Sequence, residues 1–283
     1  MENSSTRVTI GMPVYNGAST LESVLESILS QTHHDFILLI SDNASTDTTE
    51  DICRRYAKAD DRITYIRQPE NLGAERNFDY VLQEARSEYF MWAAADDIRS
   101  PDFLEKNLNF LDEHKDYLGS TSPTRFEDGQ FDPVAMGDQT RDESEPAQRI
   151  NNFFRTWHSN GRYYSLFRRE SIKDWRAANT CFLACDWFFV LTLLSKGKLK
   201  RLDEGYVVLG RAGVSNSLKI FSLYRKRWIN WLFPFYDLFI NTFPLLKGSE
   251  IKVKLRIFLF LMKINLIAAR LQIRYELKIR RKK

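Results

Sequence analysis

Two adjacent carboxylates, Asp96 and Asp97, follow an apolar stretch that has the length of one β-strand. Neighbouring carboxylates repel each other, and a hard divalent cation that also holds a phosphate is a natural partner for such a pair. The alternative is that both are turn residues, because aspartate is common in turns. The ligand-binding interpretation is favoured because three earlier predicted strands also end in polar residues: Tyr15 and Asn16, then Asp42, then Asn71.

The chain before this acidic pair alternates strand and helix. Short apolar strands are predicted at residues 8–12, 36–40 and 63–66, and a segment with helical spacing of apolar residues follows each one. Ser100 and Pro101 predict the start of a further helix, as its N-cap and first helical residue. The alternation predicts an α/β fold with a mostly parallel sheet and right-handed crossovers. Because parallel strands bring their carboxyl ends to one edge, we expect the polar residues to converge there. The alternative is that all such loops are polar.

The length and composition of the chain limit its possible domain organisation, cellular setting and metal sites. The 283 residues suffice for one large domain with an appendage, and 43% of them are hydrophobic. No basic start precedes an apolar stretch, so we expect no signal peptide. Three cysteines favour a reducing cytoplasmic setting over a disulfide framework. Cys181, Cys185 and His158 match no zinc spacing, which favours buried structural thiols over a metal site.

Three ordered motifs resemble those of family 2 glycosyltransferases. They begin at Val8 with VTIGMPVYN, at Ile40 with ISDNASTDTT, and at Glu70 with ENLGAERN. The resemblance covers about residues 7–125 and extends more weakly to about residue 215. It implies a GT-A fold, a nucleotide-sugar donor, a divalent metal (Mn²⁺ or Mg²⁺) and inversion at the anomeric carbon.

The resemblance also implies roles for single residues. Pro13 and Tyr15 would flank the nucleotide base, and Asp42 would hold the uracil or ribose. Asp96 and Asp97 would belong to the Asp-rich metal motif, with Asp96 also contacting the donor. The other implied donor-binding residues are Asn16, Asn71 and Arg76. Family members often carry a further Asp two residues before Asp96, where this chain has Ala94.

A general base is expected in the second half of the chain. Asp186 is a lone acid in an aromatic run, where desolvation would favour its accepting a proton near neutral pH. The family often has Glu-Asp here, and Cys185 replaces the first member. The alternative is a helix N-terminal residue satisfied by backbone amides. Arg211 could reach the donor diphosphate, although an arginine after a strand is common. His158 and Arg162 could touch an acceptor phosphate, but a solvated face is favoured for both.

The C-terminal segment is strongly basic. Residues 251–283 carry a net charge of +10, whereas the rest of the chain carries −6. Aromatic residues fill 227–246, which suits a lipid headgroup boundary. Seven basic residues then recur at spacings of three, four or seven, and they form one stripe of a helix: Lys252, Arg256, Lys263, Arg270, Arg274, Lys278 and Arg281. We expect residues 227–283 to lie on a membrane surface. The alternative is packing on the body or on a sister subunit, which would make the protein a homo-oligomer. Nucleic acid is not an expected partner, because the basic face lacks aromatic residues.

These observations predict three parts: a donor-binding half at 1–125, an acceptor-binding half at 126–217 that includes a polar surface loop at about 127–149, and a helical tail at 218–283. The predicted function is inverting, metal-dependent transfer from a nucleotide sugar, with a UDP-sugar favoured, to a saccharide or lipid-linked acceptor. The reaction would serve bacterial polysaccharide or glycolipid assembly at the cytoplasmic face of the membrane. Two alternatives stay open. One is a nucleotidyltransferase of the same fold, and the other is an inactive membrane-bound scaffold, suggested by Ala94 and Cys185.

Overall fold

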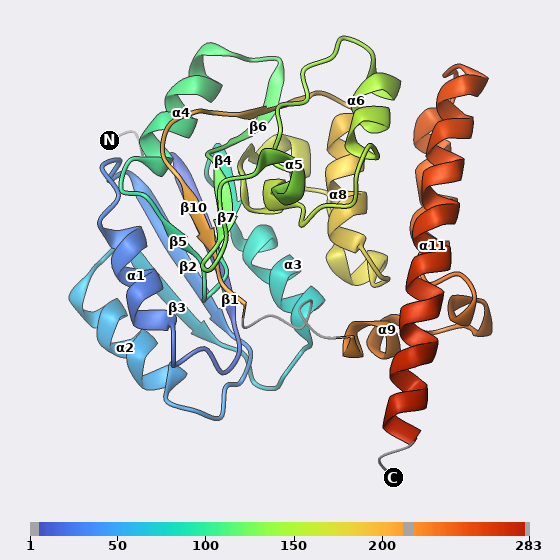
Figure 1. The fold of residues 1–283 in the computed structure, drawn as a ribbon. Helices are drawn as coiled ribbons and strands as arrows, with labels where there is room; N and C mark the ends of the chain where they lie inside the picture. The colour runs from blue at the N-terminus through green and yellow to red at the C-terminus, as the bar shows by residue number, and fades with distance from the viewer. Residues whose placement is uncertain (1–5, 212–217, 281–283) are drawn as a thin grey trace. The chain divides into compact units, whose positions relative to one another are not determined.

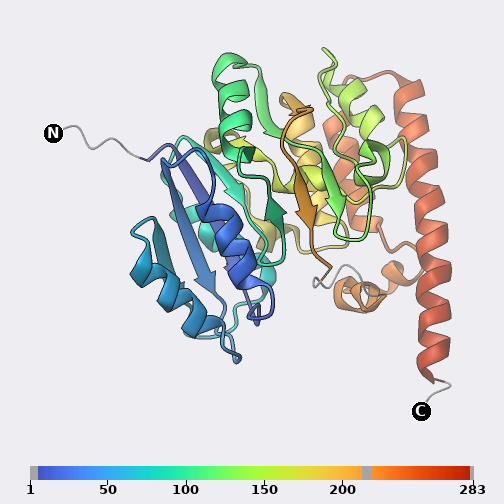
Figure 2. The ribbon, with the colours of Figure 1, turned by 60° about the vertical axis from the view of Figure 1, so that its left-hand side comes forward.

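The computed structural model describes residues 6–211 and 218–280. Its contacts divide the chain into two compact units, each assembled from several segments of the sequence (Figures 1 and 2). The first comprises the described parts of Met1–Thr140, His158–Asn179 and Lys198–Arg211. The second comprises those of Arg141–Trp157, Thr180–Gly197 and Ala212–Lys283.

Within the described residues, the first unit is built on a seven-stranded sheet of order β3-β2-β1-β4-β8-β6-β9. Strand β8 runs antiparallel to both of its neighbours, and the other adjacent pairs are parallel. The sheet is therefore mostly parallel, as predicted. The strands are β1 (Val8–Val14), β2 (Phe36–Asp42), β3 (Ile63–Arg67), β4 (Tyr89–Trp92), β6 (Tyr117–Thr121), β8 (Leu166–Arg168) and β9 (Lys198–Arg201).

Helices cover both faces of this sheet. The even-numbered side chains of β1 join a core with α1 (Leu21–Leu29), α2 (Thr49–Ala59) and α4 (Phe103–Glu113). Helix α3 (Ala74–Glu84) packs on β1 and β2 from the other face. Its approach depends on Gly11, where a Cβ would lie 2.8 Å from the side chain of Val81. Both faces of β1 are buried, which explains why its sequence is almost continuously apolar.

The segment after the acidic pair differs from the prediction. Ile98–Arg99 forms a short strand, β5, which pairs with β10 (Val207–Leu209) beside β7 (Thr124–Phe126) in a second, three-stranded sheet. Helix α4 therefore begins at Phe103 with Asp102 as its N-cap, and the predicted start at Ser100 and Pro101 is wrong. The cause is a non-local pairing that takes up the residues directly after Asp97.

The region predicted as a surface loop at 127–149 is only partly exposed. It contains α5 (Pro133–Met136) and the start of α6 (Pro146–Phe153), and it buries Asp138 and Arg149. Asp138 accepts hydrogen bonds from the backbone and the hydroxyl of Thr124, each at 2.7 Å. Short elements complete the first unit: η1 (Gly161–Tyr164), α7 (Arg169–Ile172) and η2 (Ala177–Thr180).

The second unit is helical in its described part. It comprises α6, α8 (Cys185–Leu194), α9 (Lys219–Tyr224), η4 (Trp228–Trp231), α10 (Tyr236–Thr242), η5 (Phe243–Leu246) and α11 (Ile251–Arg280). Helix α11 packs against α6, α10 and η4. Among the described helices, none combines the length and the apolar character required to cross a membrane.

Candidate donor site at the sheet edge

The order of the strands indicates where along the edge of the sheet a ligand would bind. From β1, the chain adds β2 and β3 on one side and then places β4 on the other side. Ligands bind in open α/β sheets at the carboxyl ends of the strands, where the order reverses in this way. The loops after β1 and β4 flank that point, and they carry Tyr15 and Asn16 on one and Asp96 and Asp97 on the other. A hydrogen bond of 2.7 Å from Thr20 Oγ1 to the Ala95 carbonyl ties them together.

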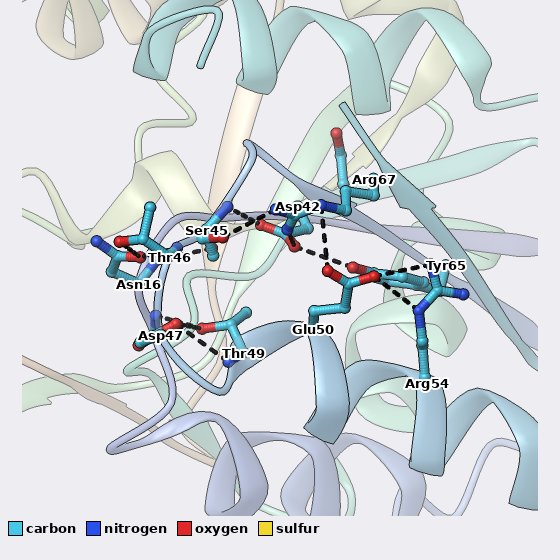
Figure 3. A network of polar contacts seen from close by, with 12 residues as sticks. Asn16, Asp42, Ser45, Thr46, Asp47, Thr49, Glu50, Arg54, Tyr65 and Arg67 are labelled. Carbon is cyan, nitrogen blue, oxygen red and sulfur yellow. Dashed lines mark hydrogen bonds and ion pairs between the residues drawn. The ribbon is translucent and has the colours of Figure 1, made fainter. Parts of the chain in front are cut away.

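The loop after β1 is also bonded to the loop after β2. The backbone N–H of Asn16 donates to Ser45 Oγ at 2.9 Å, and Asn16 Oδ1 accepts from the N–H of Thr46 at 2.8 Å (Figure 3). Asn16 has a φ of 52°, a left-handed conformation that asparagine tolerates better than most residues. Pro13 is buried near the end of β1, beyond the last residue of β1 that pairs with β4. A proline is tolerated there because no hydrogen bond of the sheet requires its N–H. Tyr15 is 49% exposed beside it.

Asp42 ends β2 and is 0% exposed. Its Oδ2 accepts hydrogen bonds from Tyr65 Oη at 2.9 Å and Arg67 Nη1 at 2.7 Å, and its Oδ1 accepts from the N–H of Ser45 at 2.9 Å (Figure 3). Burial, followed by the bond to Asp42, raises the pKa of Tyr65, so its hydroxyl remains a donor. In this structure Asp42 shapes the loop that carries Ser45, and its contact with a base or ribose stays a prediction.

Arg67 is the residue at this edge that sequence reasoning missed. Besides Asp42, its guanidinium donates to the Ser45 carbonyl at 3.0 Å and forms an ion pair with Glu50 at 3.2 Å. It therefore joins the end of β3 to β2, to the following loop and to α2. The signal in the sequence was its position, one residue beyond the predicted strand at 63–66. In the structure, the register of β2 and β3 pairs it with Asp42.

We expect Arg67→Gln to lower the free energy of unfolding, because it leaves the buried carboxylate of Asp42 without its cation. The loss should be smaller than for a fully buried pair, since a third of the Arg67 side chain is exposed. Arg54→Gln is the matched control, because Arg54 pairs with Glu50 at the surface and its loss should change stability little. Urea unfolding of both variants measures the difference. Equal stabilities would show that Arg67 does not support Asp42.

The loop after β3 is bonded to the same assembly. Asn43 donates from Nδ2 to Asn71 Oδ1 at 2.9 Å and accepts the N–H of Leu72 at 2.8 Å. Asn77, the last residue of the third motif, is buried on α3 and exchanges hydrogen bonds with Ser41. Arg76 precedes it on an exposed part of the helix. The loops after β1, β2 and β3 are thus cross-linked by their own side chains, and the polar residues predicted on them come together.

The two aspartates occupy different environments. Asp97 is 3% exposed, and its Oδ1 accepts the N–H of Gly210 at 3.1 Å. Burial raises the pKa of Asp97 to about 7, against the opposing effect of Arg99 and with a further rise from Asp96. Arg99 is itself buried and donates from Nη2 to the Trp92 carbonyl at 3.1 Å. Asp96 is half-buried and is therefore the more accessible of the two carboxylates.

The pair fits the divalent metal that the resemblance implies. Oδ2 of Asp97 is buried without a hydrogen-bond partner, so one carboxylate oxygen is unused. A Cβ on Gly210 would lie 2.4 Å from Asp96 Oδ2, so only glycine leaves room for that carboxylate. Mg²⁺ is commonly held by one or two carboxylates together with substrate phosphates. Among the described residues, this site included, no group of three or more His, Cys, Asp or Glu side chains is placed to hold a metal ion, so the protein would supply two carboxylates here.

The remaining predicted residues lie further along the chain. Arg211 follows Gly210, and its Nη2 donates to Asp128 at 2.7 Å. His158 and Arg162 are buried in the first unit, so the solvated face predicted for them is wrong. Arg162 donates from Nε to the Gln139 carbonyl at 3.0 Å, and His158 Nδ1 accepts the N–H of Asn160 at 3.1 Å.

Asp186 belongs to the second unit. It lies half-buried in the first turn of α8, after Ala184, whose φ is 65°. The next residue, Trp187, is buried against Phe153 and contacts Trp157 with ring centroids 4.7 Å apart and ring planes tilted by 32°. The proton-accepting role of Asp186 stays a prediction. Cys53 is buried under the second motif, whereas Cys181 and Cys185 are only half-buried, so the burial expected for these two thiols is wrong.

Comparison with known proteins assigns the chain to a family. The sequence profile described as glycosyl transferase family 2 matches residues 9–176, which is more than half of the chain. The chain belongs to this family. The second and third motifs and the acidic pair lie inside the matched range, which begins at the second residue of the first motif.

Curated relatives match about two fifths of the chain. The putative glycosyltransferase EpsE of Bacillus subtilis is 36% identical over 116 residues, covering 41% of this chain and 42% of the relative. The putative teichuronic acid biosynthesis glycosyltransferase TuaG of the same species is 35% identical over 111 residues, covering 39% and 44%. The alignments thus span less than half the length of these relatives.

A solved structure shares the fold. The structure of S. aureus TarS 1–349 in complex with UDP-GlcNAc matches 88% of this chain and 69% of that chain, with a TM-score of 0.64 and 17% sequence identity. The likeness supports the predicted GT-A-like arrangement of a mostly parallel sheet with flanking helices.

Proposed function

We propose that the protein transfers a sugar, with inversion, from a nucleoside-diphosphate donor to a saccharide or lipid-linked acceptor in polysaccharide or glycolipid assembly. The observation that carries the proposal is the placing of Asp96 and Asp97 opposite the Tyr15–Asn16 loop, at the point where the strand order of a family 2 chain reverses. A UDP-sugar is the favoured donor, supported by the UDP-GlcNAc complex of a protein with the same fold.

The donor would be held by the cross-linked loops at the sheet edge. The exposed ring of Tyr15, next to Pro13, is suited to stack on the base, and Asn16, Asp42 and Asn71 would fix the loops around the nucleoside. Arg76 and Arg211 are cationic groups for the diphosphate. A bound divalent metal, held by Asp96 and by Oδ2 of Asp97, would neutralise charge on the departing diphosphate.

The acceptor hydroxyl must lose a proton as its oxygen attacks the anomeric carbon. A carboxylate on the side opposite the leaving group performs this role in inverting sugar transfer. We assign it to Asp186, at the start of α8. In this division of labour, residues 1–125 bind the donor, residues 126–217 supply acceptor contacts and the base, and the segment after 218 holds the enzyme at the cytoplasmic face of the membrane.

A thermal-shift screen tests the donor assignment. A ligand that binds the folded form raises its stability, so the matching nucleoside diphosphate sugar should raise Tm by several degrees at a hundred-fold excess over its Kd. We expect the largest shift with a uridine diphosphate sugar in Mn²⁺ or Mg²⁺, and smaller shifts with thymidine and guanosine donors or with chelator. The absence of a shift with every donor would contradict the proposal. Binding without turnover on any acceptor would favour the inactive scaffold.

A further inference from the structure

Helix α11 is fastened to its unit along one face. Its buried residues recur every three or four positions, and two polar side chains on this face make specific bonds. Asn265 Oδ1 accepts the N–H of Phe235 at 2.8 Å, and Gln272 Nε2 donates to the Trp231 carbonyl at 2.7 Å. The rotation of α11 about its axis is therefore fixed within the second unit. The buried face comprises Val253, Ile257, Leu261, Ile264, Asn265, Ala268, Ala269 and Gln272.

A second apolar row on the same helix stays exposed. We call it the apolar ridge: Ile251, Leu255, Leu259, Leu266, Ile273 and Leu277, which are all exposed. Steps of four or seven residues return to the same side of an α-helix, so these side chains form one line along α11. Close by, Phe258 packs against Phe239 of α10 with ring centroids 5.8 Å apart, and Ile240 of α10 is exposed. The ridge is not needed to hold the helix in place, because the buried face already does so.

A row of cations runs beside the apolar ridge. We call it the basic ridge: Lys252, Arg256, Lys263, Arg270 and Arg274, which are all exposed. At about 100° per residue it lies next to the apolar ridge, on the side away from Phe258. The acid of this helix, Glu276, is engaged by Arg225 at 3.0 Å. Lys278 and Arg281, which the sequence places on the same stripe, lie outside the residues whose side chains are described.

We propose that the two ridges together form a docking surface for an anionic lipid bilayer, with α11 lying in the plane of the headgroups. The apolar ridge would enter the acyl boundary, and the basic ridge would meet the lipid phosphates. Helix α11 has 30 residues, so it presents a straight contact of about 45 Å (Figure 1). The sequence offered packing on the protein and membrane contact as alternatives. One face of α11 packs within its unit, and the proposal gives the bilayer contact to another face of the same helix.

Charge selects the bilayer over a second copy of the chain. Two copies joined through their apolar ridges as an antiparallel pair would bring the two basic ridges together at the rim of the contact, where like charges oppose association. A parallel pair would leave each basic ridge without an acid from the facing helix, because Glu276 is engaged by Arg225. An anionic bilayer instead offers phosphates along the whole length of the basic ridge. The inference deepens the proposed placement of the enzyme at a membrane, but it needs no donor or acceptor. Its failure would therefore leave the assignment of sugar transfer untouched.

Co-sedimentation of the full chain with vesicles tests the docking surface. We expect binding to vesicles of phosphatidylcholine mixed with phosphatidylglycerol, weak binding to phosphatidylcholine alone, and release by high salt. The double variant Lys263→Gln/Arg270→Gln should weaken partitioning roughly 25-fold, and Leu259→Gln/Leu266→Gln by a similar or larger factor. The matched controls are Lys196→Gln and Val134→Gln, which remove an exposed cation and an exposed apolar side chain that are not part of α11.

The possible outcomes distinguish a lipid bilayer from a second copy of the chain as the partner of the two ridges. All variants change exposed residues, so unchanged thermal melting verifies that each one folds. Loss of vesicle binding in the ridge variants but not in the controls supports the proposal. It is overturned if the chain ignores anionic vesicles, or if the ridge variants bind as the controls do. It is also overturned if ultracentrifugation shows a dimer that Leu259→Gln/Leu266→Gln dissociates while vesicle binding is absent.

Discussion

Asp96→Asn is expected to lower donor turnover by about 10²–10³-fold while leaving the fold intact. The change keeps the shape of the side chain but removes one negative charge from the more accessible carboxylate of the acidic pair. Groups that neutralise charge developing on a leaving group typically contribute an effect of this size. The stability of the free protein should change little, because the repulsion between Asp96 and Asp97 is relieved when one of them becomes neutral.

The measurement is nucleotide release from the donor as Mn²⁺ or Mg²⁺ is titrated. The variant should need a higher metal concentration for half-maximal activity, which is a shift that a general loss of folding would not produce. Asp203→Asn is the control, because Asp203 is an almost fully exposed acid of the same unit and should stay within about two-fold of the parent. Equal metal dependence in Asp96→Asn and the parent would remove Asp96 from the metal site.

The parallel half of the fold was predictable because its signals are local. Apolar runs of strand length and helices with apolar residues three and four apart fixed the element types, and right-handed crossovers then brought the strand ends together. Asn16 and Asn71 could be placed at this edge from their positions after strands. Their bonds to Thr46 and Asn43 could not, because these depend on the spacing of loops that are distant in sequence.

The features that could not be predicted from the sequence depend on pairings between residues that are distant along the chain. Ile98–Arg99 is too short to signal a strand, and it becomes one through Val207, more than a hundred residues later. Arg67 lies at the end of a strand like many surface arginines, and only the register of β2 and β3 places it on Asp42. In the same way, Asn265 interrupts the apolar pattern of α11, and its bond to Phe235 shows that this interruption belongs to the buried face.

Asp186→Asn is expected to lower kcat for sugar transfer by about 10²–10⁴-fold, which is the range for loss of a positioned general base. The amide keeps the size of the side chain and one acceptor oxygen but accepts no proton from the acceptor. Donor binding should be unaffected, so the thermal shift produced by the nucleotide sugar should equal that of the parent. Loss of an acid from the first turn of α8 should cost about 0.3–1 kcal/mol of stability.

The pH profile distinguishes this role from the alternative of a capping residue at the start of α8. In the parent, activity should fall at low pH as the base is protonated, whereas residual activity in Asp186→Asn should lose that limb. Glu170→Gln is the matched control, because Glu170 is an exposed acid in the first turn of α7, and it should keep both the rate and the profile. Undiminished turnover in Asp186→Asn would overturn the assignment. It would favour nucleotidyl transfer on the same fold, a reaction that needs no base beside the acceptor sugar.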